Sequence, residues 1–378
     1  MQKQQIPQKP QKVIKLPIPE INFSKILGQK SGLRPYRKGG VRIEEQKIQN
    51  KLFFHNYGYG GAGISISYGY TKLLFAKFDT KYSSDIQKEV AIIGAGYAGL
   101  YTAIECAKSG YKVTIYADNF VHNHQNTPQD LHLQAKQQIT SQVGAGLWCP
   151  LTYDYDSSEE IKERHNLCSR ISYDYYKNLI QRGSHKGISF KKIITVNHLE
   201  GNKDYSYKRN IVNGIIDDYE EVLITFNGVD MAQGEIFTTI LIEGDIFLNE
   251  LVNECKKYGV IFINQHFESL DQIIQIIPQK FIFNCSSMSS RKFFQDENLV
   301  PIKGQLVVLE KINNVDFFLN IIDKKGTELS LYPNSNYTLL GYVKLYDRWD
   351  NQPEKYIGDF LVQNIKQYFQ EAQKKQKF

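Results

Sequence analysis

The sequence VAIIGAGYAGLYTAIECAKSGYKVTIYAD, residues 90–118, decides the fold. It opens on a short apolar run into glycines, which is typical of a buried parallel strand. Residues 98–110 carry apolar side chains at helical spacing, and Gly110 is a typical helix end. Residues 111–118 predict a second strand that ends on Asp118. The stretch therefore predicts a strand–helix–strand unit within an α/β fold.

Three glycines of this stretch, Gly94, Gly96 and Gly99, match the pattern G-x-G-x-x-G between a strand and a helix. Gly94 permits the tight turn, Gly96 lets the backbone approach a pyrophosphate, and Gly99 lets the helix pack close to the strand. The start of the helix offers free N–H groups to the phosphates. Asp118 lies about 20 residues further on and can accept hydrogen bonds from ribose hydroxyls. This context predicts a dinucleotide site, but it does not distinguish NAD from FAD.

A second glycine-rich segment, HNYGYGGAG at 55–63, also runs into a helical pattern. It predicts another anion site at a helix start. Because one dinucleotide has a single pyrophosphate, this second site needs a different electron-rich target. The N1–C2=O edge of a reduced flavin carries negative charge and is suitable. The segment therefore favours FAD over a nicotinamide cofactor.

The rest of the chain alternates helical and strand-like patterns. Amphipathic helices are predicted at 159–180, 245–259 and 353–369, and strands at 188–196, 220–228, 259–265 and 280–286. Helices beside parallel strands, together with a block of antiparallel strands, indicate an α/β fold with a mixed second domain. Residues 1–20 and 372–378 are rich in Gln and Lys and predict disordered tails, the first of them basic.

The formal net charge of +6 does not indicate a nucleic-acid partner. Residues 1–19 hold four lysines and no acid, whereas a nucleic-acid surface needs clustered cations on a folded face. No run of about 18 apolar residues exists, so we expect no membrane-spanning helix. The five cysteines form no C-x-x-C pair and the eight histidines show no ligand spacing, so we expect neither a disulfide framework nor a metal site.

Several segments together carry a resemblance to a known family. They are VAIIGAGYAGL, VTIYADNF, VGAGLWCP, LIEGDIFLNELVNECKKYGVIF, FNCSSMSSRKFF with PIKGQLV, SLYPNSNYTLLG, GLRPYRKGGVRIE and HNYGYGGAGISISYG. In these segments the chain resembles the D-amino-acid oxidase and D-aspartate oxidase family of FAD-dependent enzymes, from about residue 21 to 370. The resemblance implies an FAD-binding Rossmann-type (glutathione-reductase-like) domain and a mixed, largely antiparallel substrate domain.

The order of these segments differs from the order in the family. There, the G-L-R-P-x-R and H-x-Y-G-x-G pieces close the chain, whereas here they come first, at 32–37 and 55–63. The order is therefore that of a circular permutant, with the cut between Phe369 and Asn22 and the old ends joined through residues 78–89. Both junctions are polar, and polar, exposed stretches tolerate permutation best.

The resemblance also implies a division of the chain. The expected parts are a tail at 1–20, a segment with the substrate-carboxylate arginine at 21–52, an FAD-binding domain at 53–150 and 236–297, a substrate domain at 151–235 and 298–350, a C-terminal helix at 351–371 and a tail at 372–378.

Two positions match the family's catalytic groups. Arg34 matches the arginine that grips the substrate carboxylate, for which a planar guanidinium is better suited than an ammonium group. Gly61 matches the position whose backbone carbonyl accepts a hydrogen bond from the substrate amine. The expected FAD contacts, besides the three glycines of the first motif, are Gly60, Gly61, Ala62, Gly63, Ile64, Ser65, Asp118, Thr140, Ser141, Ala145, Gly146, Leu147 and Phe267.

Other side chains have a structural expectation or depart from the family. Trp148 is expected in the core rather than against the substrate, and His55 is expected to be a structural hydrogen-bonding group rather than a base. Ser330 stands where the family usually has a tyrosine that roofs the substrate, and we expect the nearby Tyr332 to face away. Ser287 stands where the family has a glycine, and it crowds the cofactor slightly.

The resemblance implies oxidative deamination of a D-amino acid to a 2-oxo acid, ammonia and hydrogen peroxide, with oxygen as second substrate. GLRPYR, NCS-x-x-SR and the SLYP strand lean toward D-aspartate, although Lys324 and Lys325 are expected to be solvated loop lysines. The alternatives are a glycine- or sarcosine-type amine oxidase and a flavin-binding relative without turnover. A homodimer remains open, and the location is expected to be cytoplasmic or peroxisomal, since no targeting signal is recognisable.

Overall fold

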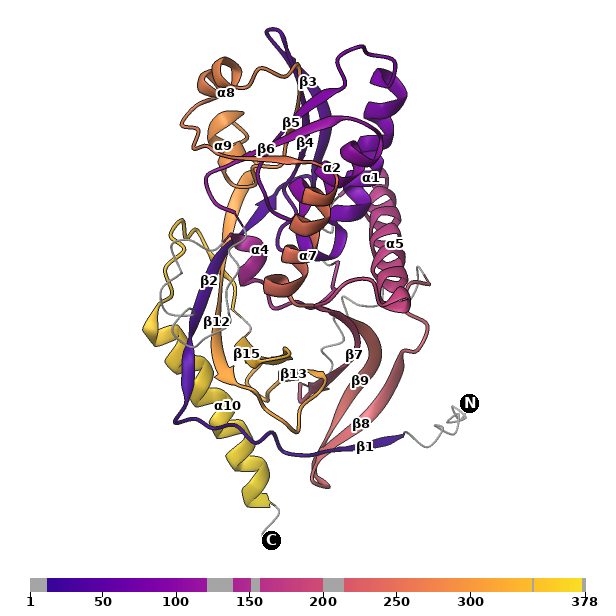
Figure 1. The fold of residues 1–378 in the computed structure, drawn as a ribbon. Helices are drawn as coiled ribbons and strands as arrows, with labels where there is room; N and C mark the ends of the chain where they lie inside the picture. The colour runs from indigo at the N-terminus through magenta and orange to yellow at the C-terminus, as the bar shows by residue number, and fades with distance from the viewer. Residues whose placement is uncertain (1–11, 121–138, 151–156, 200–213, 342, 376–378) are drawn as a thin grey trace, which may run out of the picture.

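The computed structural model describes residues 12–120, 139–150, 157–199, 214–341 and 343–375. Its strands form two sheets, one of six strands and one of ten. The smaller sheet lies at the top of Figure 1 and the larger one below it. The fold is therefore mixed α/β with two sheets, as the sequence predicts.

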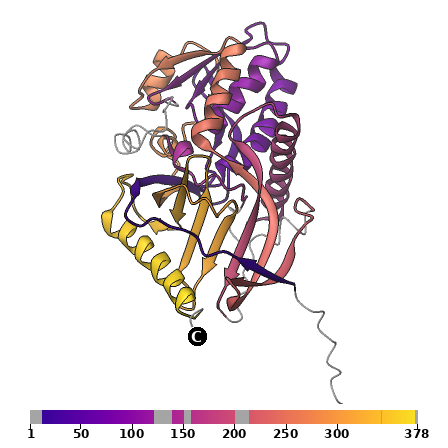
Figure 2. The same cartoon turned by 60° about the horizontal axis from the view of Figure 1, so that its bottom comes forward.

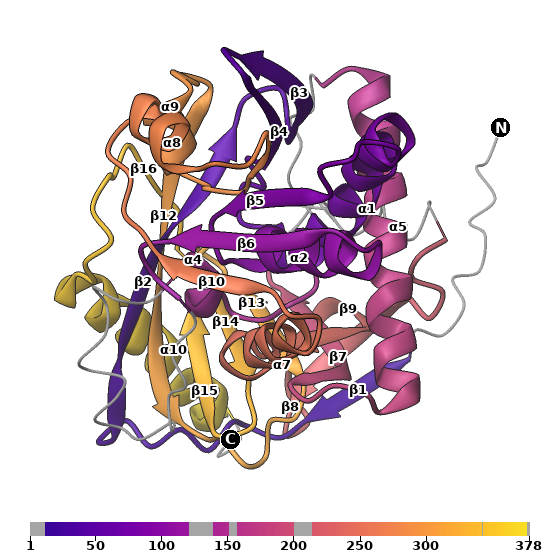
Figure 3. The same ribbon diagram turned by 45° about the horizontal axis from the view of Figure 1, so that its top comes forward.

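The six-stranded sheet contains the predicted strand–helix–strand unit, which is confirmed as β5, α2 and β6. Five of its strands are parallel, and β3 pairs antiparallel with β4. Its order is β10 (Ile261–Asn264), β6 (Lys112–Ala117), β5 (Glu89–Ile93), β11 (Phe281–Asn284), β4 (Lys51–Tyr57) and β3 (Arg42–Ile48). Figure 3 shows β5, β6 and β10 side by side.

Helices cover both faces of this sheet, and therefore its central strands β5 and β11 consist mainly of buried apolar residues. One face packs with α1 (Gly63–Tyr82), α2 (Tyr97–Lys108) and α7 (Gly244–Lys257), and the other with α8 (Leu270–Ile276) and α9 (Ser289–Phe293). The long helix α5 (Glu159–Arg182) lies against α1. Ser158 caps α5 through its side chain, and Gly183 ends the helix in the left-handed conformation.

The ten-stranded sheet is mixed and mostly antiparallel. Its strands are β1 (Val13–Leu16), β8 (Glu220–Phe226), β9 (Val229–Ile242), β7 (Ile188–Asn197), β13 (Phe318–Ile322), β14 (Glu328–Pro333), β15 (Tyr337–Gly341), β12 (Leu299–Glu310) and β16 (Leu345–Tyr346), with β2 (Ile26–Arg37) paired to β12. Helix α10 (Lys355–Lys375) packs on one face of this sheet (Figure 2). None of the helices in the described part of the chain has the length and apolar composition needed to cross a membrane.

The boundaries between the two sheets differ from the expected division. Segment 21–52 is split, because β2 belongs to the larger sheet and β3 to the smaller one. Residues 236–242 belong to the larger sheet, because they continue β9, and the chain enters the smaller one only at α7. The long antiparallel pair β2–β12, in which Arg34 lies opposite Ile302, thus leads from one sheet toward the other.

Both predicted tails are partly wrong. Residues 13–16 form β1, parallel to β8, and Leu16 and Ile18 are buried in the core. Helix α10 continues through Lys375, because Ala372 is only 1% exposed against the larger sheet. Each end contains a few apolar side chains among its polar residues, and the burial of these side chains stabilises β1 and the last turns of α10. Residues 1–11 and 376–378 lie outside the described part of the chain.

Candidate functional site

A cavity of about 120 Å³ lies where the carboxyl ends of β4, β5 and β11 meet the starts of α1 and α2. Ligands of open parallel sheets bind at this edge, outside the carboxyl ends of the strands. The cavity brings the two glycine segments together. Of the expected contacts, Gly61, Gly63, Ile64, Gly96, Thr140 and Ser141 line it; the last two belong to the short helix α4 (Thr140–Val143).

The first glycine segment leaves no room for side chains. A Cβ on Gly99 would lie 2.0 Å from the carbonyl oxygen of Gly94, and one on Gly94, whose φ is +103°, would lie 2.5 Å from that of Cys285. A Cβ on Gly96 would meet Ser141 Oγ at 3.0 Å. No side chain caps α2 at Gly96, so the first N–H groups of this helix face the cavity edge without a side-chain acceptor. This turn can hold a phosphate.

The second glycine segment is shaped by β2. Gly58 and Gly61 have φ of +94° and +99°, and Cβ atoms there would lie 2.8 Å from Arg37 Cβ and 2.6 Å from Arg34 Cδ. The N–H of Gly60 donates to the carbonyl of Pro35 at 2.8 Å. As at α2, no side chain caps the start of α1. A second set of N–H groups therefore points to the same cavity.

Arg34 and Gly61, the two expected catalytic positions, lie side by side. The guanidinium of Arg34 lies over Gly304, where a Cβ would be 2.7 Å from Cζ, and its Nη1 donates to the carbonyl of Val343 at 3.1 Å. Gly304 is on β12, the strand paired with β2. The absence of a side chain at Gly304 and at Gly61 leaves the space in which this half-buried guanidinium lies.

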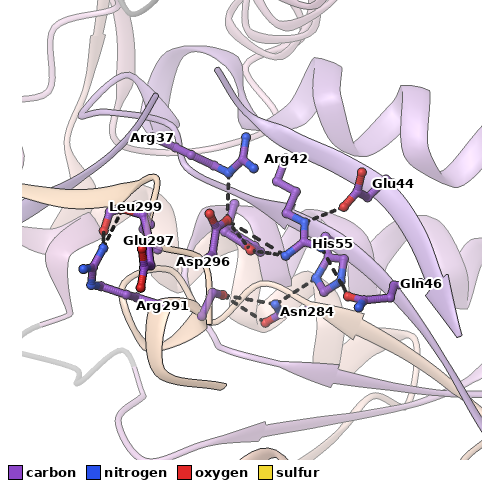
Figure 4. Close-up of polar contacts among 12 residues, drawn as sticks. Arg37, Arg42, Glu44, Gln46, His55, Asn284, Arg291, Asp296, Glu297 and Leu299 are labelled. Atoms are coloured by element: carbon purple, nitrogen blue, oxygen red, sulfur yellow. Dashed lines mark hydrogen bonds and ion pairs between the residues drawn. The ribbon is translucent and has the colours of Figure 1, made fainter. Parts of the chain in front are cut away.

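His55 has a structural role. Its ring is buried between Gln46 Oε1, 2.9 Å from Nε2, and Asn284 Nδ2, 3.1 Å from Nδ1 (Figure 4). Burial, with the positive charge of Arg42, lowers the pKa of His55 to about 3. The imidazole is therefore neutral at physiological pH and is held by β3 and β11 inside the sheet.

The turn at 145–149 joins the two sheets. Gly146, with φ of +84°, accepts at its carbonyl from the N–H of Ile242 at 2.7 Å, and Leu147 forms a bridge with Leu241. Trp148 is 2% exposed and belongs to the core of the smaller sheet's helix layer. Ala145 and Leu147 pack against the apolar face of the larger sheet that α10 does not cover.

Ser65 on α1 accepts two hydrogen bonds from the turn at 145–149. Its carbonyl accepts from Trp148 Nε1 at 3.0 Å, and its hydroxyl accepts from the N–H of Cys149 at 2.8 Å.

Asp118 and Phe267 do not line the cavity. Asp118, at the end of β6, lies 3.3 Å from His266 Nδ1 and is exposed, whereas Phe267 is buried against Tyr116.

Three cavity residues were not expected from the sequence: Ser67, Tyr97 and Cys285. Ser287, which was expected to crowd the cofactor, lines the cavity as well. The hydroxyls of Ser67 and Tyr97 are buried without a hydrogen-bond partner, which is unfavourable unless a polar ligand satisfies them. No motif marks these two residues. Ser287 has φ of +55°, which explains why a glycine suits this position. The uncapped helix starts and the glycine cradle fit a phosphate-containing cofactor such as FAD.

The expectation for Tyr332 is wrong. Ser330 and Tyr332 are two residues apart on β14 and therefore share a face of the sheet. Leu329 and Leu331 pack on the α10 side, and Tyr332 joins the apolar cluster on the opposite side. Tyr332 is thus on the same face as the position where the family has a tyrosine.

No three histidine, cysteine, aspartate or glutamate side chains of the described residues are grouped so that they could hold a metal ion. The polar groups around the cavity are instead backbone N–H groups, hydroxyls and the amide of Asn56, and Arg34 lies beside Gly61 without lining the cavity. Such a set suits an organic anion.

Comparison with known proteins agrees with this geometry. The family described as FAD dependent oxidoreductase matches residues 89–377. A D-amino-acid oxidase of Fusarium vanettenii is 54% identical over 295 residues, which cover 73% of this chain and 76% of that protein. A D-aspartate oxidase of Homo sapiens is 24% identical over 272 residues, covering 70% and 71% of the two chains.

Two solved structures have a similar fold. An iminodiacetate oxidase from Chelativorans sp. superposes with a TM-score of 0.51 at 15% identity and covers 73% of this chain and 77% of its own. The L-α-glycerophosphate oxidase from Mycoplasma pneumoniae with FAD bound gives a TM-score of 0.52 at 14% identity with the same coverage.

Proposed function

Because the chain belongs to the family of FAD-dependent oxidoreductases, we propose that it oxidises D-amino acids to 2-oxo acids, ammonia and hydrogen peroxide. The observation that carries this proposal is the position of Arg34 beside Gly61, at the cavity where both glycine segments meet. The names of the D-amino-acid oxidase relatives support the same reaction.

The smaller sheet holds FAD in this proposal. The start of α2 at Gly96, with Thr140 and Ser141, would hold the pyrophosphate, and the start of α1 at Gly63 would face the flavin ring. Asp118, exposed after β6 and outside the cavity, would hold the adenosine ribose. When bound, FAD would supply the two-electron oxidation of the amine and its coupling to oxygen.

The larger sheet presents the substrate. Arg34 binds the carboxylate through its planar guanidinium, and the carbonyl of Gly61 accepts from the amine, so that two groups orient the α-carbon. Lys324 and Lys325 are exposed in the turn between β13 and β14. Because these lysines are solvated, they give no support to D-aspartate as the preferred substrate.

The permuted order is part of this proposal. The family match begins at Glu89, the first residue of β5, and leaves residues 1–88 outside. These residues supply β4 and α1 of the cofactor layer and the strand with Arg34. The two ends of the proposed junction lie close, since Lys366 Nζ on α10 is 5.7 Å from the centre of the Phe23 ring.

The permutation can be tested by restoring the usual order. Joining the end of α10 to Lys12 through a flexible linker, so that β1 is kept, and opening the chain near Ser84 should give a folded protein that binds FAD, because the new ends fall after α1 in an exposed connection. A soluble product that binds no flavin would show that the present order is required.

The reaction is tested by anaerobic reduction of the purified flavoprotein. D-amino acids should bleach the visible flavin bands, and L-amino acids should not. Admission of oxygen should restore the bands and produce hydrogen peroxide. Bleaching by glycine or sarcosine alone would identify the other amine oxidase, and a flavin that no amine reduces would identify a binding protein without turnover.

A further inference from the structure

Three walls of the cavity come from segments far apart in the sequence: the end of β2, the Gly58–Gly63 turn after β4, and the turn after β11 that begins at Cys285. Backbone contacts join the end of β2, in the larger sheet, to the turn after β4, in the smaller one: the N–H of Gly60 donates to the carbonyl of Pro35 at 2.8 Å, and Tyr36 forms an antiparallel bridge with Tyr59. A group of buried side chains adds a second connection between the same two segments, and Figure 4 shows part of it.

Asp296 is at the centre of this group. Its Oδ2 accepts from Arg37 Nε at 2.8 Å and from the Tyr57 hydroxyl at 2.7 Å, and Arg42 Nη1 lies 3.9 Å away (Figure 4). The carboxylate is 4% exposed. Burial raises the pKa of Asp296, but the hydrogen bonds from Arg37 and Tyr57 lower it more, so that its pKa lies below the usual value.

Both donors of these hydrogen bonds adjoin the second glycine segment. Tyr57 precedes Gly58 directly and lines the cavity, and Arg37 Cβ occupies the space that a Gly58 Cβ would need, 2.8 Å away. Arg37 is also three residues from Arg34 on the same strand. One carboxylate therefore connects the strand that carries the substrate arginine to the turn that faces the flavin.

Asp296 is itself held in place. Arg291 Nη1 donates to the carbonyls of Glu297 at 2.6 Å and Leu299 at 2.9 Å, and the N–H of Leu299 donates to the carbonyl of Asp296 at 3.1 Å. The turn before β12 is thus fixed to α9 of the smaller sheet's layer. Movement of the Asp296 carboxylate would require this turn to open.

Resting on the proposed function, we propose that Asp296 is a positioning residue: through Arg37 and Tyr57 it sets Arg34 and the Gly58–Gly63 turn at the separation that lets substrate carboxylate and flavin be bound together. Asp296 contacts neither ligand in this proposal. Its effect on the substrate passes through Arg34, and its effect on FAD passes through the turn.

The test compares Asp296→Asn with Glu105→Gln. Glu105 is a comparable control, since it is 8% exposed and pairs with Lys72 at 2.7 Å between α2 and α1, away from β2. FAD affinity of the apoprotein is measured by quenching of flavin fluorescence, and KM and kcat are measured separately with D-amino acids. Thermal unfolding reports the structural cost of each substitution.

Asp296→Asn should weaken FAD binding and raise KM by about tenfold each, with a smaller change in kcat per bound flavin, because the loss of one charge-assisted contact weakens positioning without removing a reacting group. Glu105→Gln should lower stability and leave both constants unchanged. If Asp296→Asn is less stable than the wild type but has the same FAD affinity and the same KM, Asp296 has a structural role alone, and the proposal is overturned.

Tyr57→Phe keeps the inference testable should Asp296→Asn not fold, because it removes one hydroxyl from the same carboxylate. It should raise KM and weaken FAD binding in the same sense, by a smaller factor.

The double variant Arg37→Ala/Asp296→Ala is compared with the single variants Arg37→Ala and Asp296→Ala. Its KM should be no higher than that of the single variant with the larger rise, since both residues act through one contact. A double variant in which the two rises in KM add would overturn the proposal. Wild-type protein that binds FAD but oxidises no D-amino acid would contradict the proposed function, and the FAD affinities would still decide the role of Asp296.

Discussion

The two glycine segments differ in what requires their glycines. At Gly94 and Gly99 the conflicting atoms are backbone: a Gly99 Cβ would overlap the Gly94 carbonyl oxygen at 2.0 Å. At 58–63 they are side chains of β2, since Gly58 faces Arg37 and Gly61 faces Arg34. Backbone cannot move without the strand and helix that it joins, whereas a long side chain can. The first segment is therefore a local motif, and the second depends on a strand of the other sheet.

The largest expected effect is that of Gly99→Ala. The added methyl group overlaps backbone, so α2 must move away from β5, at about 3 kcal/mol or more of stability. The variant should purify without flavin and unfold at a lower temperature, as absorbance and calorimetry would report. A full complement of FAD in this variant would remove the distinction between the two segments.

Arg34→Lys should affect substrate and not cofactor. A point charge replaces the planar fork, and loss of such a charge pair costs on the order of 2–5 kcal/mol, roughly 30- to several-thousand-fold in kcat/KM. FAD should stay bound, because the proposed cofactor contacts lie elsewhere. Oxidation of an amine that has no carboxylate should be little slower in Arg34→Lys than in the wild type. Near-normal turnover of D-amino acids would exclude Arg34 from the site.

Gly61→Ala should retain more flavin than Gly99→Ala and less than Arg34→Lys. The new Cβ meets Arg34 Cδ at 2.6 Å, and φ of +99° is strained for alanine by about 1–3 kcal/mol. Because the Arg34 side chain can shift, most of the flavin should remain, but KM should rise about tenfold as the guanidinium is displaced. Complete loss of flavin, as in Gly99→Ala, would show that the second segment is as rigid as the first.

The smallest effect concerns His55, which opens the second segment. Its pKa of about 3 in the folded protein lies below that of an exposed histidine, so the unfolded chain takes up a proton that the folded protein does not. Stability should therefore fall as the pH drops below about 6.5, by about 2 kcal/mol at pH 5. Urea unfolding at pH 7 and pH 5 measures this loss.

His55→Gln should reduce that pH dependence, and His266→Gln serves as the control because His266 is exposed. An unchanged pH dependence in His55→Gln would show that the imidazole is not the group that resists protonation.

The parts of the fold that were predicted correctly depend on local patterns. The apolar run into Gly94, the helical spacing up to Gly110 and the strand ending at Asp118 each carry their signal within a few residues, and β5, α2 and β6 follow them. β1 and the last turns of α10 were not predicted. They are stabilised by burial against strands far away in sequence, and Leu16 and Ala372 carry no local sign of it.

The same contrast holds for the site. Gly96, Thr140 and Ser141 were placed by motif and resemblance, and they line the cavity. Ser67 and Asp296 were not, because a buried hydroxyl or carboxylate is recognised only by what surrounds it. Tyr332 was placed wrongly, although strand alternation alone puts it on the face of Ser330.

By itself, the sequence determined the glycine turn between strand and helix and the mixed α/β class, since both rest on residue type and spacing, whereas the candidate pair Arg34 and Gly61 came from the resemblance to the family. Only the tertiary structure decided how β2 and β4, in different sheets, are brought to one cavity. The reason is physical: glycines and strand patterns act over a few residues, whereas the Asp296 carboxylate joins Arg37 and Tyr57 over more than 200 positions of the chain, and such contacts form only when both sheets have folded.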